Sequence, residues 1–365
     1  MRFGLFAHLR VLRAALAPLR QRGFGKAQAL LWQLPAAVLL RAWRALAQPC
    51  NAALLSGTAG ARRCAEFQQR LPQDGRPRLY VIVMPQTLHF LQPCLSLLVD
   101  SAQLVLLANG ARRWERQWLA RRFPTLPLHV LPTLPASSAP HGAVVSLLLR
   151  TEGASFGILD HDAYVFDGGL LPRLLPTGRD SMVSCFEARS EETGLAYPLT
   201  HLLFLNAPVL RELMERWQVD ARLYRRAPAS VAEPFAQLHL GPRSYLKPYQ
   251  GFFDTLHVLL IVAQAEGWTP RFVPMASEAP VWHVGGTSIG SHHTKPLFAL
   301  YLHLRFLELV GDETLSRRYA FMAAPLTHSD EALQRCMPGD AGWQGLPIAL
   351  ALLDRLQQRL QPPTT

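Results

Sequence analysis

Short apolar runs alternate with longer amphipathic segments through the middle of the chain. The apolar runs have the length and composition of buried strands, and they fall at 79–84, 103–107, 127–131 and 156–160. The segments between them have helical spacing, and they fall at 88–101, 112–122 and 141–150. Strands that alternate with helices predict βαβ units, and therefore an α/β fold with a mostly parallel, Rossmann-like central sheet flanked by helices.

The pattern continues less regularly beyond this region. Apolar runs at 181–187 and 199–206 predict two more strands, and a helix is expected at 207–217. The stretch 222–250 is rich in Pro, Arg and Tyr and lacks periodicity, which is typical of a lid or an acceptor-binding loop. Its basic residues either neutralise a phosphate or are simply solvated: Arg222, Arg225, Arg226, Arg243 and Lys247. Helical spacing returns at 296–310, 316–322 and 346–360.

These patterns divide the 365 residues into three regions. We expect a basic amphipathic helical extension over 1–75, an α/β domain over 76–295, and a C-terminal helical region over 296–365 packed on that domain. A hydrophobic content of 49% is ample for a core. The five cysteines contain no Cys-x-x-Cys, so neither a zinc knuckle nor a disulfide framework is indicated, and a cytoplasmic, reducing compartment is expected.

The net charge of +11 belongs almost entirely to the N-terminal region. No acidic residue precedes Glu66, and the basic residues before it are Arg2, Arg10, Arg13, Arg20, Arg22, Lys26, Arg41, Arg44, Arg62 and Arg63. The rest of the chain is close to neutral. A nucleic-acid partner is therefore not expected, because the main domain has no diffuse basic surface.

The N-terminal helices have two interpretations. Residues 1–45 either lie on an anionic membrane surface, placing the protein peripherally on the inner face of the cytoplasmic membrane, or pack an apolar stripe on the main domain. The apolar run at 30–40 is about half the ~20 residues that a membrane span needs. No cleavage site of the secretory kind follows a short apolar core.

Two carboxylates, Asp160 and Asp162, follow the apolar run that begins at Phe156. In an extended segment they point to the same side, where they repel each other unless a cation lies between them. Mg²⁺ and Mn²⁺ favour such oxygen ligands. The alternative is that Asp160 caps a turn and Asp162 is solvated.

Loops that follow successive parallel strands meet at one edge of the sheet, where ligands of α/β proteins bind. Three such loops are expected to converge: Pro85-Gln86-Thr87, Asn109-Gly110 and Asp160-His161-Asp162. No Gly-x-Gly-x-x-Gly follows the first strand, which disfavours a dinucleotide cofactor. A phosphate-binding P-loop motif is also missing from the sequence.

The order of these elements and motifs over roughly 78–300 resembles the GT-A glycosyltransferases, particularly their inverting family-2-like group. Three points carry the resemblance: Asp160-His161-Asp162, similar to the family's Asp-x-Asp; the segment Gly251–Thr255 before a helix; and the segment Val281–Ser288, which contains His283, Gly285 and Gly286. The resemblance implies that 76–295 is a GT-A-like catalytic domain and that the cofactor is divalent Mn or Mg.

The resemblance also implies roles for individual residues. Asp160 and Asp162 would bind the metal, with His283 as third ligand; a core or turn histidine is the alternative for His283, and His292-His293 could compete. Asp254, whose apolar surroundings are expected to raise its pKa, would be the catalytic base, or else an Asp at a helix N-terminus. The expected nucleotide-sugar-binding residues are Pro85, Gln86, Thr87, Asn109, Asp160, His161, Gly285 and Gly286.

Two positions depart from the family pattern. Ala108 stands where the family carries an Asp that holds the donor base, although Asn109 could supply an amide. Phe253 replaces the first acid of the expected Glu-Asp pair. An unusual donor or a weakened enzyme would explain either change.

The sequence thus predicts a metal-dependent glycosyltransferase that moves a sugar from a nucleotide-diphosphate sugar to an acceptor hydroxyl with inversion. A glycan or lipid-linked acceptor, in cell-envelope or lipid-linked glycan synthesis, fits the basic N-terminus. Two alternatives remain: a sugar nucleotidyltransferase, which generally has a Gly-rich, basic first loop, and a catalytically degenerate, membrane-associated scaffold.

Overall fold

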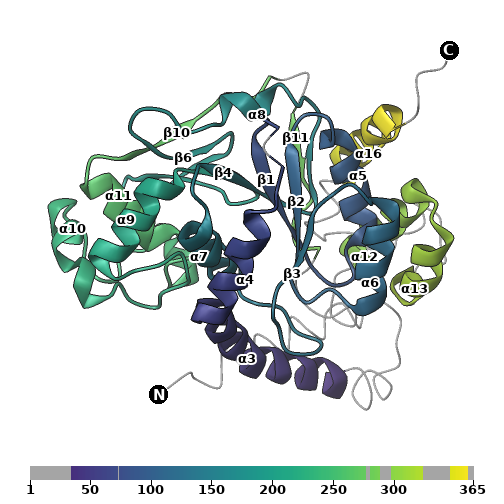
Figure 1. Ribbon diagram of the computed structural model, residues 1–365, viewed down its shortest axis with the longest axis horizontal. Helices are drawn as coiled ribbons and strands as arrows, with labels where there is room; N and C mark the ends of the chain where they lie inside the picture. Colours follow the sequence, from purple (N-terminus) through teal and green to yellow (C-terminus); the bar gives the residue numbers. More distant parts are fainter. Residues whose placement is uncertain (1–33, 73, 277–279, 288–296, 324–345, 361–365) are drawn as a thin grey trace. The chain divides into compact units, whose positions relative to one another are not determined.

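The computed structural model describes residues 34–72, 74–276, 280–287, 297–323 and 346–360 (Figure 1). The chain divides into two compact units. Unit 1 comprises Met1–Leu46, Gln86–Ser96 and Val284–Thr365, and unit 2 comprises Ala47–Pro85 and Leu97–His283. Each unit is described by itself below.

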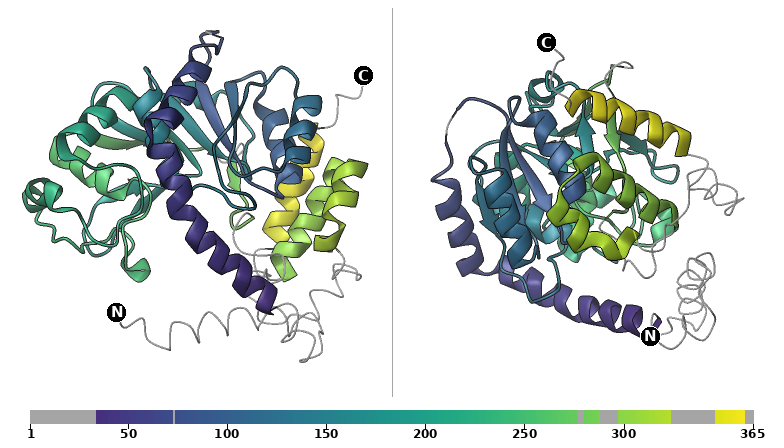
Figure 2. Two further views of the ribbon diagram at one scale, coloured as in Figure 1. Left: turned by 60° about the horizontal axis from the view of Figure 1, so that its bottom comes forward. Right: turned by 90° about the vertical axis from the view of Figure 1, so that its right-hand side faces the viewer.

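A seven-stranded mixed sheet forms the centre of unit 2 (Figures 1 and 2). Its strand order is β10-β6-β9-β4-β1-β2-β3. Neighbours are parallel except β9, which runs antiparallel to both β4 and β6. The strands are β1 Arg78–Val83, β2 Gln103–Ala108, β3 Leu128–Val130, β4 Phe156–Asp160, β6 Asp180–Ser184, β9 Leu202–Leu205 and β10 Thr269–Phe272. The predicted α/β class with a mostly parallel central sheet is confirmed.

Continuous apolar runs form the inner strands because their side chains are buried on both faces of the sheet. Every residue of β2 is buried, as are the last five of β1. Gly157 in β4 lies in register with Leu79 and Phe204 on the two neighbouring strands. A Cβ at position 157 would come within 2.6 Å of the Leu79 side chain and 2.8 Å of the Phe204 ring, so glycine is needed for these strands to approach.

Helices of unit 2 share one core with the sheet. Residues of α4, α7, α9 and α11 pack with alternating residues of β1 and β4, such as Tyr80, Phe156 and Ile158. Gly142 of α7 lies where a Cβ would come within 2.5 Å of the Ala221 carbonyl oxygen, so this helix passes close to the segment that follows α9. The helices are α4 Thr58–Gln68, α6 Arg113–Arg122, α7 His141–Thr151, α8 Leu170–Arg173, α9 Ala207–Trp217, α10 Ala232–Gln237 and α11 His257–Ala265, with short 3-10 turns η2 Ala229–Val231 and η3 Pro248–Gln250.

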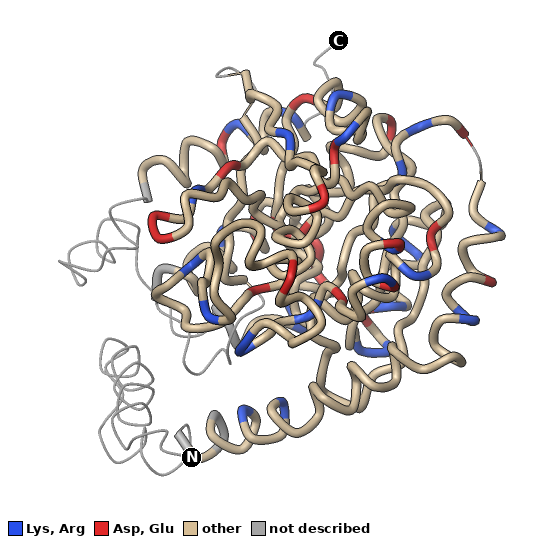
Figure 3. Tube along the Cα trace, turned by 90° about the vertical axis from the view of Figure 1, so that its left-hand side faces the viewer, with Lys and Arg blue, Asp and Glu red and all other residues tan. Residues whose placement is uncertain are grey.

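The N-terminal region divides differently from the expected boundary at residue 75. Helix α3, Leu34–Ser56, begins in unit 1, and its last residues belong to unit 2. Leu55, Cys64 and Leu71 are buried in the sheet's core, so the part of the predicted extension from Ala47 onward packs on the main domain. Helix α3 carries basic residues and no acidic ones (Figure 3). The helix expected near the start of the chain lies outside the described residues.

Two small antiparallel pairs complete unit 2. β5 Ala163–Val165 pairs with β11 Val281–His283, and β7 Glu187–Arg189 pairs with β8 Ala196–Pro198. The single strand expected at 181–187 is therefore divided between β6 and β7. A short helix, α10, interrupts the stretch 222–250 that was expected to be irregular throughout.

Unit 1 is helical where it is described. It contains α12 Leu297–Val310, α13 Glu313–Ala323, α16 Leu346–Leu360 and most of α5 Leu88–Leu98. His89 of α5 and His303 of α12 share a buried hydrogen bond, with 2.8 Å between Nε2 and Nδ1. Phe90 packs on Phe306 beside them. Among the described helices, none combines the length and apolar character that crossing a bilayer requires.

Candidate active site

A carboxylate pair and a histidine meet at the end of β4. Strand β4 ends at Asp160, and β5 starts directly after Asp162. Strand β11 pairs antiparallel with β5 so that His283 lies opposite Ala163. The pairing brings the His283 Nε2 to 3.7 Å from an Asp160 oxygen and 3.5 Å from an Asp162 oxygen. The structure thus places together the three residues that the sequence predicts as metal ligands.

The three side chains offer ligand atoms that all lie within 4.8 Å of one another. Burial and the Asp162 charge raise the pKa of Asp160 to about 7, although His283 acts in the opposite direction. Burial alone would lower the pKa of His283, but its contact with Asp162 and both carboxylate charges raise it. Two carboxylates beside one imidazole leave excess negative charge in a low-dielectric setting. A hard divalent cation fits this donor set and would relieve the repulsion.

His201 contacts two residues of the cluster, His283 and Asp160. Its ring stacks on the His283 ring at a centroid distance of 4.1 Å and an interplanar angle of 11°. Its carbonyl accepts a hydrogen bond from the Asp160 N–H at 2.9 Å. Burial and the nearby His283 and Lys247 lower its pKa to about 3, so the ring is neutral near pH 7. A lone histidine before a strand carries no distinguishing pattern, and sequence reasoning did not find it.

Asp254, the expected catalytic base, is held in an ion pair. The Lys247 Nζ lies 3.0 Å from Asp254 Oδ2, and the Thr255 N–H donates to Asp254 Oδ1 at 2.8 Å. Burial raises the pKa of Asp254, but these two hydrogen bonds and the charges of Lys247 and His257 lower it below its ordinary value. The expected raised pKa is therefore wrong, because a lysine seven residues away in sequence folds onto the carboxylate.

The alternative helix-terminal role for Asp254 also differs from what is found. Helix α11 begins at His257, and its N-cap is Leu256 in a left-handed conformation. Asp254 precedes the helix by three residues, and its own N–H donates to His257 Nδ1 at 3.2 Å. The carboxylate therefore caps the turn that leads into α11 rather than the helix itself.

The charge of Lys247 affects histidines in both carboxylate regions. Its Nζ lies 5.9 Å from the centre of the Tyr197 ring, and its charge lowers the pKa of both His201 and His257. His201 contacts the metal-ligand cluster, and His257 contacts Asp254. The charge of Lys247 therefore acts on a histidine of each carboxylate region.

The other predicted nucleotide-sugar residues fall in different surroundings. Asn109 is buried, and its side-chain amide both donates to and accepts from the backbone of Ala139, so it ties two loops together. Pro85 is half-buried just beyond β1, and His161 is buried between the two aspartates. Their binding roles stay predictions.

Four predicted donor-binding residues belong to unit 1 and are described only within it: Gln86, Thr87, Gly285 and Gly286. Both glycines have positive φ, at 72° and 68°, a conformation that favours glycine. Their roles also stay predictions. His292-His293, the alternative metal ligands, lie outside the described residues.

Comparison with protein families places part of the chain in a glycosyltransferase family model. Residues 56–210 match the StrH glycosyltransferase N-terminal domain. The matched segment contains β1 to β9, including the Asp160–Asp162 loop, and ends before Lys247, Asp254 and His283. This match supports a glycosyltransferase and the resemblance to the GT-A enzymes. Comparison with curated proteins returned no match.

Solved structures of glycosyltransferases show weak similarity to the chain. An active-site mutant of LgtC has a TM-score of 0.29 and 15% identity, covering 37% of this chain and 59% of that one. The apo WbbM bifunctional glycosyltransferase has a TM-score of 0.30 and 11% identity, covering 55% and 39%. S. aureus TarS 1-349 has a TM-score of 0.32 and 10% identity, covering 78% and 81%. The chain spans less than two thirds of the LgtC and WbbM structures, and these similarities are too low to carry an inference about function.

Proposed function

We propose that the chain is a metal-dependent glycosyltransferase that moves a sugar from a nucleotide-diphosphate sugar to an acceptor hydroxyl with inversion. The observation that carries this proposal is the Asp160–Asp162–His283 cluster, which belongs to the same unit as Asp254 and its partner Lys247. The family match over 56–210 supports the reaction class. The acceptor is proposed to be a glycan or a lipid-linked glycan of the cell envelope.

Asp160, Asp162 and His283 would hold a Mn²⁺ or Mg²⁺ ion, which stabilises the charge that develops on a departing diphosphate. The protein's own part is to pre-arrange the three ligands. Strand pairing fixes His283 opposite Ala163, and the His201 ring limits its rotation. Little reorganisation is then needed when the donor arrives.

Asp254 would accept the proton of the acceptor hydroxyl. Lys247 keeps this carboxylate ionised in the free protein, and so available as a proton acceptor. An acceptor hydroxyl that displaces Lys247 Nζ from Asp254 Oδ2 would return the pKa toward its ordinary value. The base would then strengthen only when the acceptor is in place.

Donor binding measured by calorimetry tests the proposal. UDP-, GDP- and dTDP-sugars are titrated with and without Mn²⁺ into the wild type, the Asp160→Asn/Asp162→Asn variant and an Asp100→Asn control at an exposed carboxylate. We expect at least one sugar nucleotide to bind in a Mn²⁺-dependent way that the double variant loses and the control retains. Binding by no sugar nucleotide would favour a scaffold, and turnover of a nucleoside triphosphate would favour a nucleotidyltransferase.

A further inference from the structure

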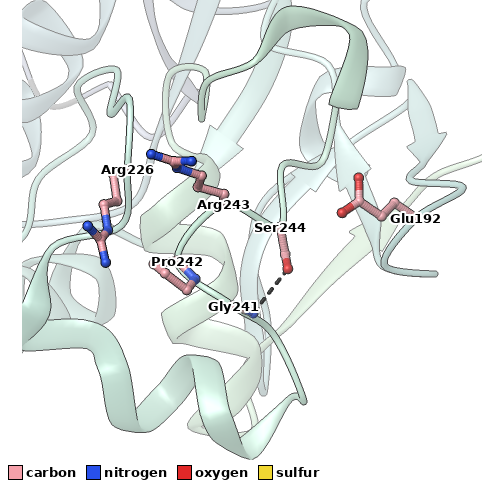
Figure 4. Close-up of a pocket in the computed structure, with 6 residues that line it drawn as sticks. All are labelled: Glu192, Arg226, Gly241, Pro242, Arg243 and Ser244. Carbon is pink, nitrogen blue, oxygen red and sulfur yellow. Dashed lines mark hydrogen bonds between the residues drawn. The ribbon is translucent and has the colours of Figure 1, made fainter.

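An open hollow lies in unit 2, beside the loop between α10 and Lys247. Its volume is about 520 Å³. Two arginines and a serine approach it from one pair of loops, and a glutamate lies beyond the serine (Figure 4). The lining residues are Glu192, Arg226, Gly241, Pro242, Arg243 and Ser244. The metal-ligand cluster is not among them.

Backbone hydrogen bonds hold the two arginine-bearing loops together. The Ala227 N–H donates to the Pro242 carbonyl at 3.0 Å, which places positions 226 and 243 on neighbouring strands of chain. The Tyr245 hydroxyl donates to the Arg225 carbonyl at 2.8 Å, which is a second hydrogen bond between the same loops. These hydrogen bonds fix the positions of the two loops that form the hollow.

The charged groups of the hollow suit a phosphate. The side chains of Arg226 and Arg243 are exposed, and neither is paired with another side chain in the described part of the chain. A guanidinium group presents a planar fork of donors that matches phosphate oxygens. Ser244 Oγ accepts from the Gly241 N–H at 3.0 Å, which leaves the hydroxyl hydrogen free to be donated to a ligand.

Glu192 gives the hollow a second kind of group. Figure 4 shows its carboxylate on the far side of Ser244 from the two arginines. A carboxylate accepts hydrogen bonds and would repel a second phosphate, so this end suits the hydroxyl groups of a sugar. The two ends together define a ligand with one phosphate and several hydroxyls.

The same loops are connected directly to the candidate base. Tyr224 exchanges two backbone hydrogen bonds with Phe253, at 3.0 and 2.8 Å, and Phe253 is followed by Asp254. The Phe253 ring lies 4.9 Å from the ring of Tyr245, next to Ser244. A ligand in the hollow is therefore anchored to the chain segment that carries Asp254.

We propose that this hollow binds the phosphate group of a phosphorylated sugar acceptor, with the phosphate on Arg226 and Arg243 and sugar hydroxyls on Glu192 and Ser244. The proposal rests on the proposed function, since it names the acceptor class of that reaction. It is tested without donor and without metal, so that it can fail while the glycosyltransferase proposal holds.

Protection from phenylglyoxal tests the hollow, because this reagent modifies accessible guanidinium groups and peptide mass spectrometry resolves each arginine. The full chain is treated in EDTA with glucose 6-phosphate, with glucose, or with vesicles of phosphatidylglycerol at equal ionic strength. Arg121, exposed in α6, is the internal control. At three times its Kd, glucose 6-phosphate should slow modification of Arg226 and Arg243 about fourfold, because the free fraction falls as 1/(1+[L]/Kd). Glucose should leave both unprotected.

Phosphorus NMR of glucose 6-phosphate supplies a second readout. Line broadening on adding the wild type should disappear with Arg226→Gln/Arg243→Gln and persist with Arg121→Gln. Equal protection of all three arginines, or protection of none, would overturn the proposal. Protection by the vesicles and not by glucose 6-phosphate would also overturn it, since the phosphate would then belong to a lipid headgroup.

Discussion

The two carboxylate regions of unit 2 differ in how their charge is balanced. Asp160 and Asp162 face each other and one imidazole, and burial raises the pKa of Asp160 to about 7. Asp254 is also partly buried, but Lys247 neutralises it and its pKa falls below the ordinary value. Similar residues are therefore suited to different chemistry. Unbalanced carboxylates favour an added cation, whereas the paired Asp254 carboxylate stays ionised near neutral pH.

The largest effect is expected where the unbalanced pair is removed. Asp160→Ala/Asp162→Ala should lower sugar transfer by about 10³-fold or more, because the diphosphate charge would lose its cation. Transfer is measured with the donor identified by calorimetry. Asp100→Ala, at an exposed carboxylate, should retain activity. Near-normal transfer by the double variant would show that Asp160 and Asp162 do not hold a cation that transfer needs.

Neutralising the balanced carboxylate should spare donor binding. Asp254→Asn is expected to lower kcat by about 10²-fold or more, since a positioned base contributes roughly that factor. Donor affinity in the presence of Mn²⁺ should stay at the wild-type value. A variant that turns over normally, or one that fails to bind donor, would show that Asp254 is not the base.

Metal affinity should depend on pH through Asp160. This group must lose its proton to bind a cation, and its pKa is about 7 without one. Mn²⁺ affinity should therefore fall as the pH drops from 8 to 6, by about tenfold per unit for the Asp160 proton and more steeply where His283, whose pKa is also raised, is protonated as well. Titration calorimetry at several pH values measures the slope. A flat profile would mean that Asp160 is already ionised throughout.

Removing the balancing charge should shift a pH profile by a smaller amount. In Lys247→Met, Asp254 loses its hydrogen bond and a neighbouring positive charge, so its pKa should rise. The acid limb of kcat/KM against pH, which reports the free enzyme, should move to higher pH, because protonation then removes the base at a higher pH than in the wild type. Arg179→Met, at an exposed basic residue, is the control. An unmoved acid limb would show that Lys247 does not lower the pKa of Asp254.

Most of the central sheet was predictable because its strands are continuous apolar runs between helical segments. The direction of β9 was not, since an apolar run such as 202–205 is the same in parallel and antiparallel pairing. The α10 helix lies in a stretch without periodicity, and its six residues leave little pattern to detect.

The site was predictable in part for a similar reason. Asp160, Asp162 and His283 occur in recognisable motifs, and the strand pairing that unites them follows from neither motif. The stacking of His201 on His283 joins segments that are distant in the sequence. The Lys247–Asp254 pair depends on how the short segment between the two residues folds, so the pKa of Asp254 was predicted in the wrong direction. The hydrogen bonds between the Asn109 amide and Ala139 also join two loops, a contact that the sequence pattern does not show.

The central claim is that one divalent ion is held by Asp160, Asp162 and His283. Electron spin-echo spectroscopy of bound Mn²⁺ tests it most directly, because modulation from a coordinated imidazole nitrogen reports the histidine itself. We expect one Mn²⁺ per chain with nitrogen modulation that His283→Gln abolishes and His201→Gln preserves. Unchanged nitrogen modulation in His283→Gln, or no bound Mn²⁺ in the wild type, would contradict it.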